Sequence, residues 1–267
     1  IFTNVGLTAD GQPWWEGIDN GQRPAIDWQG QPHDPAVRPA AHPNSRFTVS
    51  ARRCPSYSPM AEDPHGVPIS AIVFGGRRAS LVPLVFQARD WTHGVLVGAS
   101  MGSETTAAAT GAVGVMRRDP MAMKPFCGYN FADYFAHWLS FDRPGARLPA
   151  IFHVNWFRKG DDGKFLWPGF GDNLRVLEWI IGRVEGRAQA TETPIGHLPA
   201  PGALNLDGLS LDAEAMEKLF GMDRDGWRAE FDGIAGYLSD FGPRMPKALG
   251  EQAREITARL VPESRSK

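Results

Sequence analysis

The stretch that decides the fold is residues 152–179, FHVNWFRKGDDGKFLWPGFGDNLRVLEW. It continues an apolar, β-branched run, so we predict a strand over residues 150–157. Asp-Asp-Gly at 161–163 is a turn signal, and residues 164–167 return the chain, which predicts a hairpin. A helix is then expected to begin at Asn173, because the apolar residues that follow repeat with helical spacing. The pattern predicts strand, hairpin and helix in close succession.

The same stretch is dense in aromatic residues, namely Trp156, Phe157, Phe165, Trp167 and Phe170. Aromatic faces can sandwich a planar base, and a helix start offers free backbone N–H groups and a side-chain amide to read its edge. The helix start here is Gly169, Phe170, Gly171, Asp172 and Asn173. The alternative is a well-packed hairpin core, and the residues alone favour that alternative.

Two short arginine motifs lie amino-terminal to this stretch. They are HPNSRF at 42–47 and FGGRR at 74–78, the second directly after a predicted strand. Glycine lets a backbone approach a ligand closely, and the planar fork of arginine matches pairs of phosphate or carboxylate oxygens. Each motif is therefore a candidate anion site. A surface turn with solvated arginines is the alternative for both.

The rest of the chain mixes helices and strands without regular alternation. Residues 8–69 are rich in Pro, Gly and Trp and predict loops and short strands. Apolar runs predict strands at 72–74, 82–86, 94–97 and 113–116. Helical spacing predicts helices at 131–139, with Asn130 as N-cap, at 227–238 and at 249–260. The fold class that follows is mixed α/β.

Composition excludes several classes of protein. The 28 Lys and Arg against 30 Asp and Glu give a net charge of −2, which argues against a nucleic-acid binder. No apolar run approaches the ~18 residues that a membrane helix needs. Two cysteines, Cys54 and Cys127, fit a reducing, cytoplasmic protein. The histidines show no metal-ligand spacing, so no metal site is predicted within the chain, and the GxxxxGK[ST] phosphate loop is absent from it.

Four segments together resemble the carboxy-terminal half of GTP-dependent phosphoenolpyruvate carboxykinases. They are residues 42–47, 74–78, 124–138 (KPFCGYNFADYFAHW) and 152–179. The ATP-dependent carboxykinases share the fold but not these strings, so the resemblance also selects the nucleotide. It implies conversion of oxaloacetate and GTP to phosphoenolpyruvate, CO₂ and GDP, with small molecules as the only partners.

The resemblance assigns roles to individual residues. On the substrate side it places Asn44, Ser45 and Arg46, with Arg46 also near the γ-phosphate and therefore catalytic. Arg77 would hold nucleotide phosphate. The guanine pocket would comprise Trp156, Phe157, Phe165, Gly169, Phe170, Gly171, Asp172 and Asn173. A mobile lid over 103–112 would include Ser103, Glu104, Thr105, Thr106, Ala107, Ala108, Ala109 and Thr110. Ala79-Ser80-Leu81 departs from the Pro-x-Gly common in animal members, which puts the turn after Arg78 in doubt.

The resemblance also implies an organisation larger than this chain. Residues 1–66 and 117–267 would belong to the nucleotide-binding domain, and 67–116 to the other domain. The sequence begins at Ile1 without an initiator Met, and the resemblance would place the Mn²⁺ ligands and the phosphate loop upstream of it. Mg²⁺ would arrive with the nucleotide. The chain alone is then expected to be an inactive piece of a monomeric enzyme. The alternative is a guanine-nucleotide-binding module without catalysis.

Overall fold

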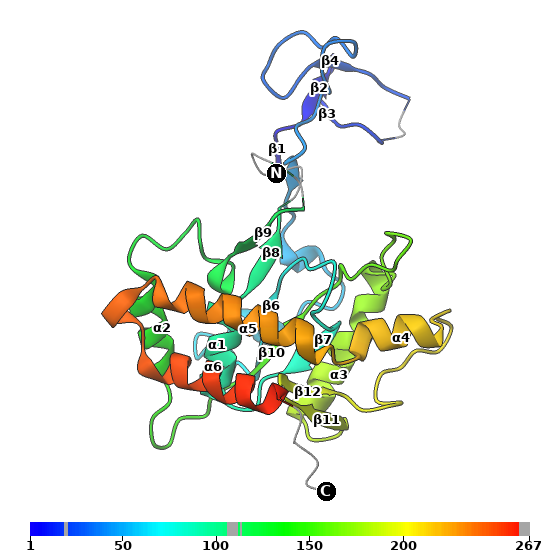
Figure 1. Cartoon of the computed structure of the whole chain (residues 1–267). Coiled ribbons are helices and arrows are strands. Elements are labelled where there is room, and N and C mark those ends of the chain that lie inside the picture. Colours follow the sequence, from blue (N-terminus) through cyan, green and yellow to red (C-terminus); the bar gives the residue numbers. More distant parts are fainter. Residues whose placement is uncertain (19–20, 106–111, 113, 262–267) are drawn as a thin grey trace, which may run out of the picture. The chain divides into compact units, whose positions relative to one another are not determined.

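The computed structural model describes residues 1–18, 21–105, 112 and 114–261 (Figure 1). The chain divides into two compact units. The first contains Ile1–Pro68, and the second contains Ile69–Glu104 together with the chain from Gly114 onward. The second unit carries most of the predicted site, and the first carries the 42–47 motif.

The first unit consists of short strands, turns and loops. Strand β1 (Phe2–Thr3) pairs antiparallel with β5 (Arg46–Phe47), and β2 (Gly6–Thr8) lies between β3 (Pro13–Trp14) and β4 (Pro24–Ile26). Two 3₁₀ turns follow, η1 (Ala51–Arg53) and η2 (Pro59–Glu62). Asp27 orders one loop by accepting hydrogen bonds from the backbone N–H of Gln29 and Gln31. The prediction of loops and short strands is confirmed.

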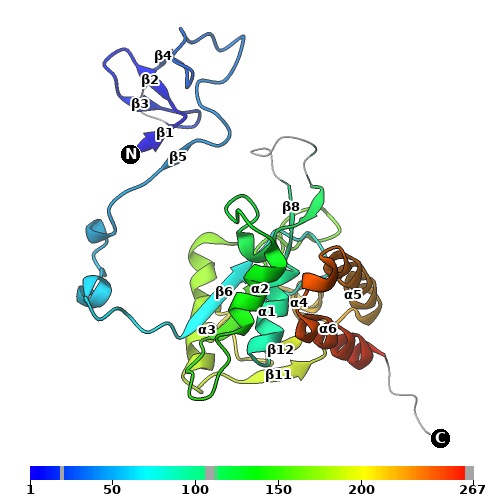
Figure 2. The ribbon, with the colours of Figure 1, turned by 90° about the vertical axis from the view of Figure 1, so that its left-hand side faces the viewer.

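The second unit is built on a five-stranded sheet. Its order is β11 (Ala190–Thr193), β12 (Gly196–Pro199), β7 (Val85–Gln87), β10 (Ala150–Val154) and β6 (Ala71–Gly75). Strand β10 runs parallel to β6, and the other pairs are antiparallel. With helices on both faces of a mixed sheet, the prediction of a mixed α/β fold is confirmed (Figure 2).

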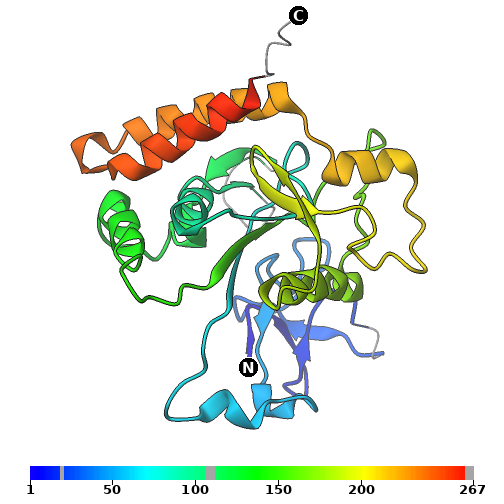
Figure 3. The same ribbon diagram turned by 90° about the horizontal axis from the view of Figure 1, so that it is seen from below.

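The six α-helices of the described chain are α1 (Trp91–Ala99), α2 (Phe131–Leu139), α3 (Asn173–Val184), α4 (Ala213–Phe220), α5 (Arg224–Ser239) and α6 (Lys247–Leu260). Residues of β10 alternate between two cores, as a strand period of two requires. Ile151 packs with α1, α2, α5 and α6, whereas Phe152 and Val154 pack with α3. Figure 3 shows the same ribbon from below. The predicted starts of α2 and α3 are confirmed, and the Asn130 side chain caps α2 by accepting from Ala132 N at 2.8 Å.

The strand predicted at 94–97 is wrong, because these residues lie within α1. Asp90 caps this helix by accepting a hydrogen bond from His93 N. Glycines allow it to approach the sheet closely: a Cβ at Gly94 would lie 2.4 Å from Ile151 Cδ1, and one at Gly98 would lie 2.6 Å from Phe74 Cε2. Because the helix is buried on nearly every side, its sequence lacks the polar face that reveals a helix.

Shorter elements complete this unit. Strand β8 (Gly102–Glu104) pairs antiparallel with β9 (Met116–Arg118), so the strand predicted at 113–116 begins and ends later than expected. Residue 113 itself lies outside the described residues. Three 3₁₀ turns remain, η3 (Pro120–Ala122), η4 (Phe170–Asp172) and η5 (Gly242–Arg244).

Residues 69–104 share one core with the chain from Gly114 onward. The reason is the pairing of β6 and β7 with β10 in one sheet, with α1 packed against it. Residues 69–104 therefore belong to the same compact unit as the chain from Gly114 onward, whereas Ile1–Pro68 belong to the other unit. Which domain of a longer enzyme residues 67–116 belong to stays a prediction.

Candidate functional site

The parallel pair β6–β10 positions the candidate site. Val154 is the register partner of Gly75, so the two strands end side by side. Segments that leave the carboxyl ends of neighbouring parallel strands emerge at the same sheet edge, where ligands commonly bind. Here these segments are the Gly-Arg-Arg turn at 76–78 and the start of the hairpin at 155–157. The guanidinium carbon of Arg77 lies 5.8 Å from the centroid of the Phe157 ring.

Arg77 is held on a tightly bonded turn. Its backbone N donates to Ser103 Oγ at 3.1 Å, and its backbone O accepts from Glu104 N at 2.8 Å. Its Nε donates to Glu104 O at 3.3 Å, while its two terminal nitrogens have no partner among the residues described. A Cβ at Gly76 would lie 2.3 Å from Gly102 O, so glycine is required there. The turn thus presents the open end of the guanidinium to an anion.

The base of the predicted lid is part of this arrangement. Ser103 and Glu104 belong to β8, and both contact the Arg77 turn. Thr105 Oγ1 donates to Ala112 O, which joins the two ends of the segment. The remaining predicted lid residues lie outside the described residues; they are Thr106, Ala107, Ala108, Ala109 and Thr110.

Two of the predicted base-stacking residues lie together. The rings of Phe157 and Phe165 meet edge to face, with centroids 5.8 Å apart and planes inclined at 79°. Lys159 Nζ lies 5.5 Å from the Phe165 centroid, so this ring has a cation over it as Phe157 has Arg77. Phe165 remains 56% exposed. Trp156 instead packs partly into the core beneath α3, which makes it a support for the hairpin.

Phe170 stands apart from that pair. Its side chain is 96% exposed, and no ring contact joins it to Phe157 or Phe165. Its φ of +46° is uncommon for a residue with a side chain, and it follows Gly169 with φ of +78°. Strained backbone of this kind concentrates at functional sites. An apolar ring held in solvent by strained backbone suits a ligand that covers it.

Asn173 is the first residue of α3, and its side-chain oxygen already accepts a hydrogen bond within the protein. The indole Nε1 of the buried Trp167 donates to Asn173 Oδ1 at 2.9 Å. The Nδ2 group therefore carries the two donors that remain for a ligand. Asp172 Oδ1 accepts from Arg175 Nε at 2.9 Å and does not cap the helix. The first turn of α3 thus keeps backbone N–H groups without a side-chain cap.

The motif predicted for the substrate side, residues 42–47, lies in the first unit. Arg46 is exposed on the two-residue strand β5, and its Nε and Nη2 donate to Asn44 Oδ1 at 3.1 and 2.9 Å. Ser45 N donates to His42 O at 2.8 Å, and Asn44 N donates to His42 Nδ1 at 3.0 Å. Residues 42–46 thus form a small bonded turn that presents one arginine.

A family model described as "Phosphoenolpyruvate carboxykinase C-terminal P-loop domain" matches residues 1–259. The chain belongs to the phosphoenolpyruvate carboxykinase family. This confirms the resemblance drawn from the four sequence segments.

Curated carboxykinases cover nearly the whole chain. The phosphoenolpyruvate carboxykinase (GTP) of Chlamydia pneumoniae is 52% identical over 97% of the chain, and that of Anaeromyxobacter sp. (strain K) is 51% identical over 97%. That of Thermoplasma volcanium is 53% identical over 94%. The chain spans 42–44% of the length of these relatives.

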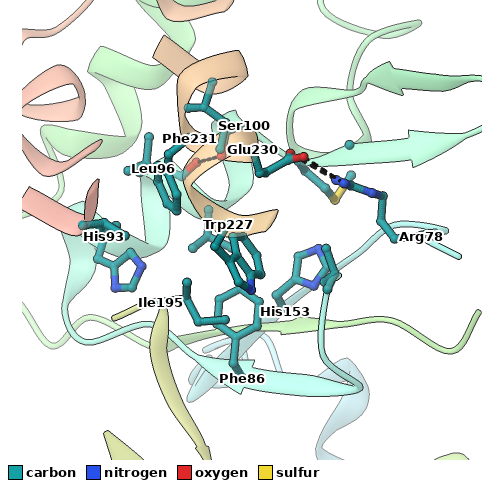
Figure 4. Close-up of a pocket in the computed structure, with 16 residues that line it drawn as sticks. Arg78, Phe86, His93, Leu96, Ser100, His153, Ile195, Trp227, Glu230 and Phe231 are labelled. Carbon is teal, nitrogen blue, oxygen red and sulfur yellow. Dashed lines mark hydrogen bonds and ion pairs between the residues drawn. The ribbon is translucent and has the colours of Figure 1, made fainter. Parts of the chain in front are cut away.

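An ion cluster that the sequence reasoning missed supports the Arg77 turn, and Figure 4 shows its pair of Arg78 and Glu230. Arg78 donates to both carboxylate oxygens of Glu230 on α5, at 3.1 and 2.9 Å. Arg118 on β9 donates to Glu230 at 2.7 Å and to Ser100 O at 2.8 Å. Burial opposes ionisation, yet Arg78 and then Arg118 hold the pKa of Glu230 below its ordinary value. The cluster joins the turn, the strand that returns from the predicted lid, and α5.

A cavity of about 50 Å³ lies beside this cluster, lined in part by His153 and Trp227 (Figure 4). Among the described residues, neither His153 Nδ1 nor Trp227 Nε1 has a partner. Burial lowers the pKa of His153 to about 4, so the ring is neutral near pH 7. Ligand pockets usually reach roughly 300 Å³ or more, so the cavity is too small for a nucleotide.

Within the described ranges, no three His, Cys, Asp or Glu side chains come together as a metal site. This part of the carboxykinase therefore does not fit Mn²⁺ by itself. In the same ranges, every helix is too short or too polar to span a bilayer.

Proposed function

We propose that the protein containing this chain is a GTP-dependent phosphoenolpyruvate carboxykinase. The observation that carries the proposal is the meeting of Arg77 with Phe157 at the ends of β10 and β6, in a chain of that family. A guanidinium with open terminal nitrogens beside two aromatic rings, one half-buried and one exposed, is suited to a nucleotide, because the guanidinium takes phosphate and the rings stack the base.

Asn173 accounts for the choice of guanine over adenine. The bond from Trp167 Nε1 to Asn173 Oδ1 fixes the orientation of the amide, and Nδ2 then offers two N–H donors to a base. Both purines present the acceptor N7, but guanine presents the acceptor O6 at the position where adenine presents the donor amino group N6. The Asn173 donors therefore pair with guanine O6 and leave adenine with an unmatched donor. Inosine keeps O6 and satisfies the same residue.

In this reaction the protein mainly has to stabilise the negative charge on the phosphates and the enolate. Breaking the bond between oxaloacetate and its departing carboxylate releases CO₂ and leaves pyruvate enolate. The enolate oxygen then takes the γ-phosphoryl group of GTP, and GDP leaves. Positioning and charge neutralisation dominate such transfers. We assign Arg77 to nucleotide phosphate, and Asn44, Ser45 and Arg46 to the substrate side. A lid over 103–112 would exclude water from the enolate.

We place the Mn²⁺ site outside the described part of this chain and bring Mg²⁺ in with the nucleotide, so no step here passes through a metal. A monomeric, cytoplasmic enzyme remains our proposal. The cytoplasmic location is supported by two unpaired cysteines, Cys54 and Cys127, which fit a reducing compartment. We expect no turnover from the 267 residues alone, because we assign the metal ligands to a part of the protein outside this chain. A coupled assay on the isolated chain with both metals tests this point.

The experiment that tests the function compares GTP, ITP and ATP in the intact protein, with oxaloacetate, Mn²⁺ and Mg²⁺. We expect phosphoenolpyruvate from GTP and ITP but little from ATP. Asn173→Ala should reduce the preference for GTP over ATP while leaving the GTP-to-ITP ratio unchanged. Leu174→Ala changes the next residue on the same helix, which is exposed and has no edge-reading group, and serves as the control.

Three outcomes distinguish the alternatives. Guanine-selective binding together with turnover supports the enzyme. Selective binding without turnover in the intact protein favours a non-catalytic nucleotide-binding module. Equal binding of GTP and ATP would remove the guanine pocket from both accounts.

A further inference from the structure

Asn155 lies between the Gly-Arg-Arg turn and the hairpin, and its side chain bonds to Arg78 on one side and to Phe157 on the other. It is the first residue after β10, and its side chain is fully buried. Its backbone N donates to Leu84 O at 2.9 Å, which anchors it to the segment that leads into β7. A polar amide at this depth is stable only when its hydrogen-bonding groups are satisfied.

The amide of Asn155 is satisfied completely. Its Oδ1 accepts from the backbone N–H of Arg78 at 3.2 Å and from that of Phe157 at 3.2 Å. Its Nδ2 donates to Arg78 O and to Val82 O, both at 2.9 Å. An asparagine offers two lone pairs and two N–H groups, so no hydrogen-bonding capacity is left over.

These bonds connect the phosphate side of the site to the base side. Arg78 follows Arg77 directly, so fixing both backbone groups of Arg78 fixes the point from which Arg77 extends. The hydrogen bond from Phe157 N to Asn155 Oδ1 likewise fixes the backbone position from which the Phe157 ring extends. Through a single oxygen, Asn155 Oδ1, the turn and the hairpin share one anchor.

We propose that Asn155 is a positioning residue that couples the phosphate contact of Arg77 to the base contact of Phe157. The inference rests on the proposed nucleotide binding and deepens it. A bound nucleotide needs its base and phosphate partners at one fixed separation, and displacements of about 1 Å are costly in such sites. Asn155 sets that separation from beneath the site.

Other side chains cannot reproduce this pattern. Aspartate has the same shape and accepts from both N–H groups, but it turns two donors into acceptors that face Arg78 O and Val82 O. Leucine fills the space and leaves every one of these backbone groups unpaired. Serine is smaller, adds no charge and leaves room for water. The pair Asn155→Asp and Asn155→Ser therefore separates added charge from lost geometry.

The test measures dissociation constants of GMP and GTP by calorimetry on the intact protein. GMP lacks the β- and γ-phosphates and therefore reports mainly the base side, whereas GTP reports both sides. We expect each Asn155 variant to weaken GMP at least about threefold and GTP at least about tenfold, since several hydrogen bonds are lost. In an Arg77→Ala background the additional loss for GTP should fall to that for GMP, because the phosphate contact is already absent. Such non-additivity is the signature of coupling.

Ile256→Val is the control for loss of stability alone. Ile256 is fully buried on α6 and makes no hydrogen bond to the turn or the hairpin. It should lower the melting temperature and leave both dissociation constants unchanged. If one Asn155 variant does not fold, the other carries the measurement.

The outcomes for the inference and for the proposed function are separable. If the wild type binds GTP and a folded Asn155 variant binds it equally well, the inference is overturned and the function stands. Equal losses for GMP and GTP would also overturn it, since Asn155 would then serve the base alone. If the wild type binds neither nucleotide, the proposed function fails and the inference fails with it.

Discussion

The two arginine motifs had equal standing in the sequence, yet the structure holds them very differently. Arg77 lies on a turn, and its backbone N, backbone O and side-chain Nε all form hydrogen bonds with Ser103 or Glu104 at the start of the predicted lid. Arg46 lies on a two-residue strand and is exposed; within the described chain its guanidinium donates only to Asn44 Oδ1, two residues away.

From this difference we expect the two arginines to contribute to different steps, one to binding and the other to reaction. A guanidinium held on a rigid support loses little conformational freedom when a ligand arrives, so its contact contributes directly to affinity. An exposed arginine on a short strand must be ordered by the ligand, and this ordering offsets part of its contribution to affinity. We expect its interaction to strengthen in the transition state, where charge develops. We therefore expect Arg77 to govern nucleotide affinity and Arg46 to govern turnover.

The largest expected effect is that of Arg46→Ala on the rate. Removing one charge-stabilising group from a reacting centre typically costs ~10²–10³ in kcat. We expect a loss of that size in the intact protein, with the dissociation constant for GTP changed by less than about threefold. Steady-state kinetics and calorimetry on the same preparation measure both quantities. A loss of GTP affinity as large as the loss of kcat would break the proposed division.

Arg77→Ala should show the opposite pattern. We expect GTP to bind roughly 10–100-fold more weakly, because a charge-assisted contact to phosphate is lost, while the unfolding midpoint stays nearly constant. The neighbouring Arg78 provides a matched control, since its side chain is largely buried against Glu230. Arg78→Ala should lower the melting temperature clearly, because Glu230 then keeps only Arg118. Equal melting temperatures for the two variants would contradict this assignment.

Sequence reasoning succeeded where the signal is local. The starts of α2 and α3 follow from an N-cap asparagine and from helical spacing, and both were located to the residue. It failed at α1, because a helix buried on nearly every side has no polar face to reveal its period. The match to four short segments supplied the family, since such strings carry more information than periodicity does.

The site could be predicted only in part for a related reason. Arg77 and Phe157 were each named from their own segments, but their contact depends on the parallel pairing of β6 with β10, which are far apart in the chain. No sequence pattern distinguishes Asn155 from any other asparagine at the end of a strand, because three of its four side-chain hydrogen bonds join it to residues more than 70 positions away. Glu230 was missed likewise, because its two arginine partners come from distant elements.

A smaller effect is expected at Phe170, the exposed ring of the base side. Stacking on a base is typically worth ~1–3 kcal/mol, so Phe170→Ala should weaken GTP roughly tenfold or more. Stability should not fall, because the ring packs against nothing and its φ is unfavourable. Phe170→Gly should bind GTP as weakly and be slightly more stable. Calorimetry and thermal unfolding distinguish these variants, and unchanged binding in both would exclude Phe170 from the pocket.

The smallest expected effect separates the two motifs by pH. Glu230 has a pKa held below its ordinary value of 4.5, with Arg78 the largest of the influences that lower it, and burial opposing. A carboxyl whose folded pKa is depressed stabilises the fold fully above its unfolded pKa, and that contribution is lost as pH falls through the folded value. Glu230→Gln keeps the shape but removes the charge. It should cost about 1 kcal/mol near pH 7, and the difference from wild type should shrink as pH falls below 4.5. Denaturant unfolding of both proteins from pH 7 to pH 3 measures this difference directly.

The 42–47 motif has no carboxylate partner in the described chain, so Arg46→Ala should show a stability difference from wild type that does not vary over the same range. A difference for Glu230→Gln that stays constant to pH 3 would mean that the Arg77 turn does not depend on this ion pair.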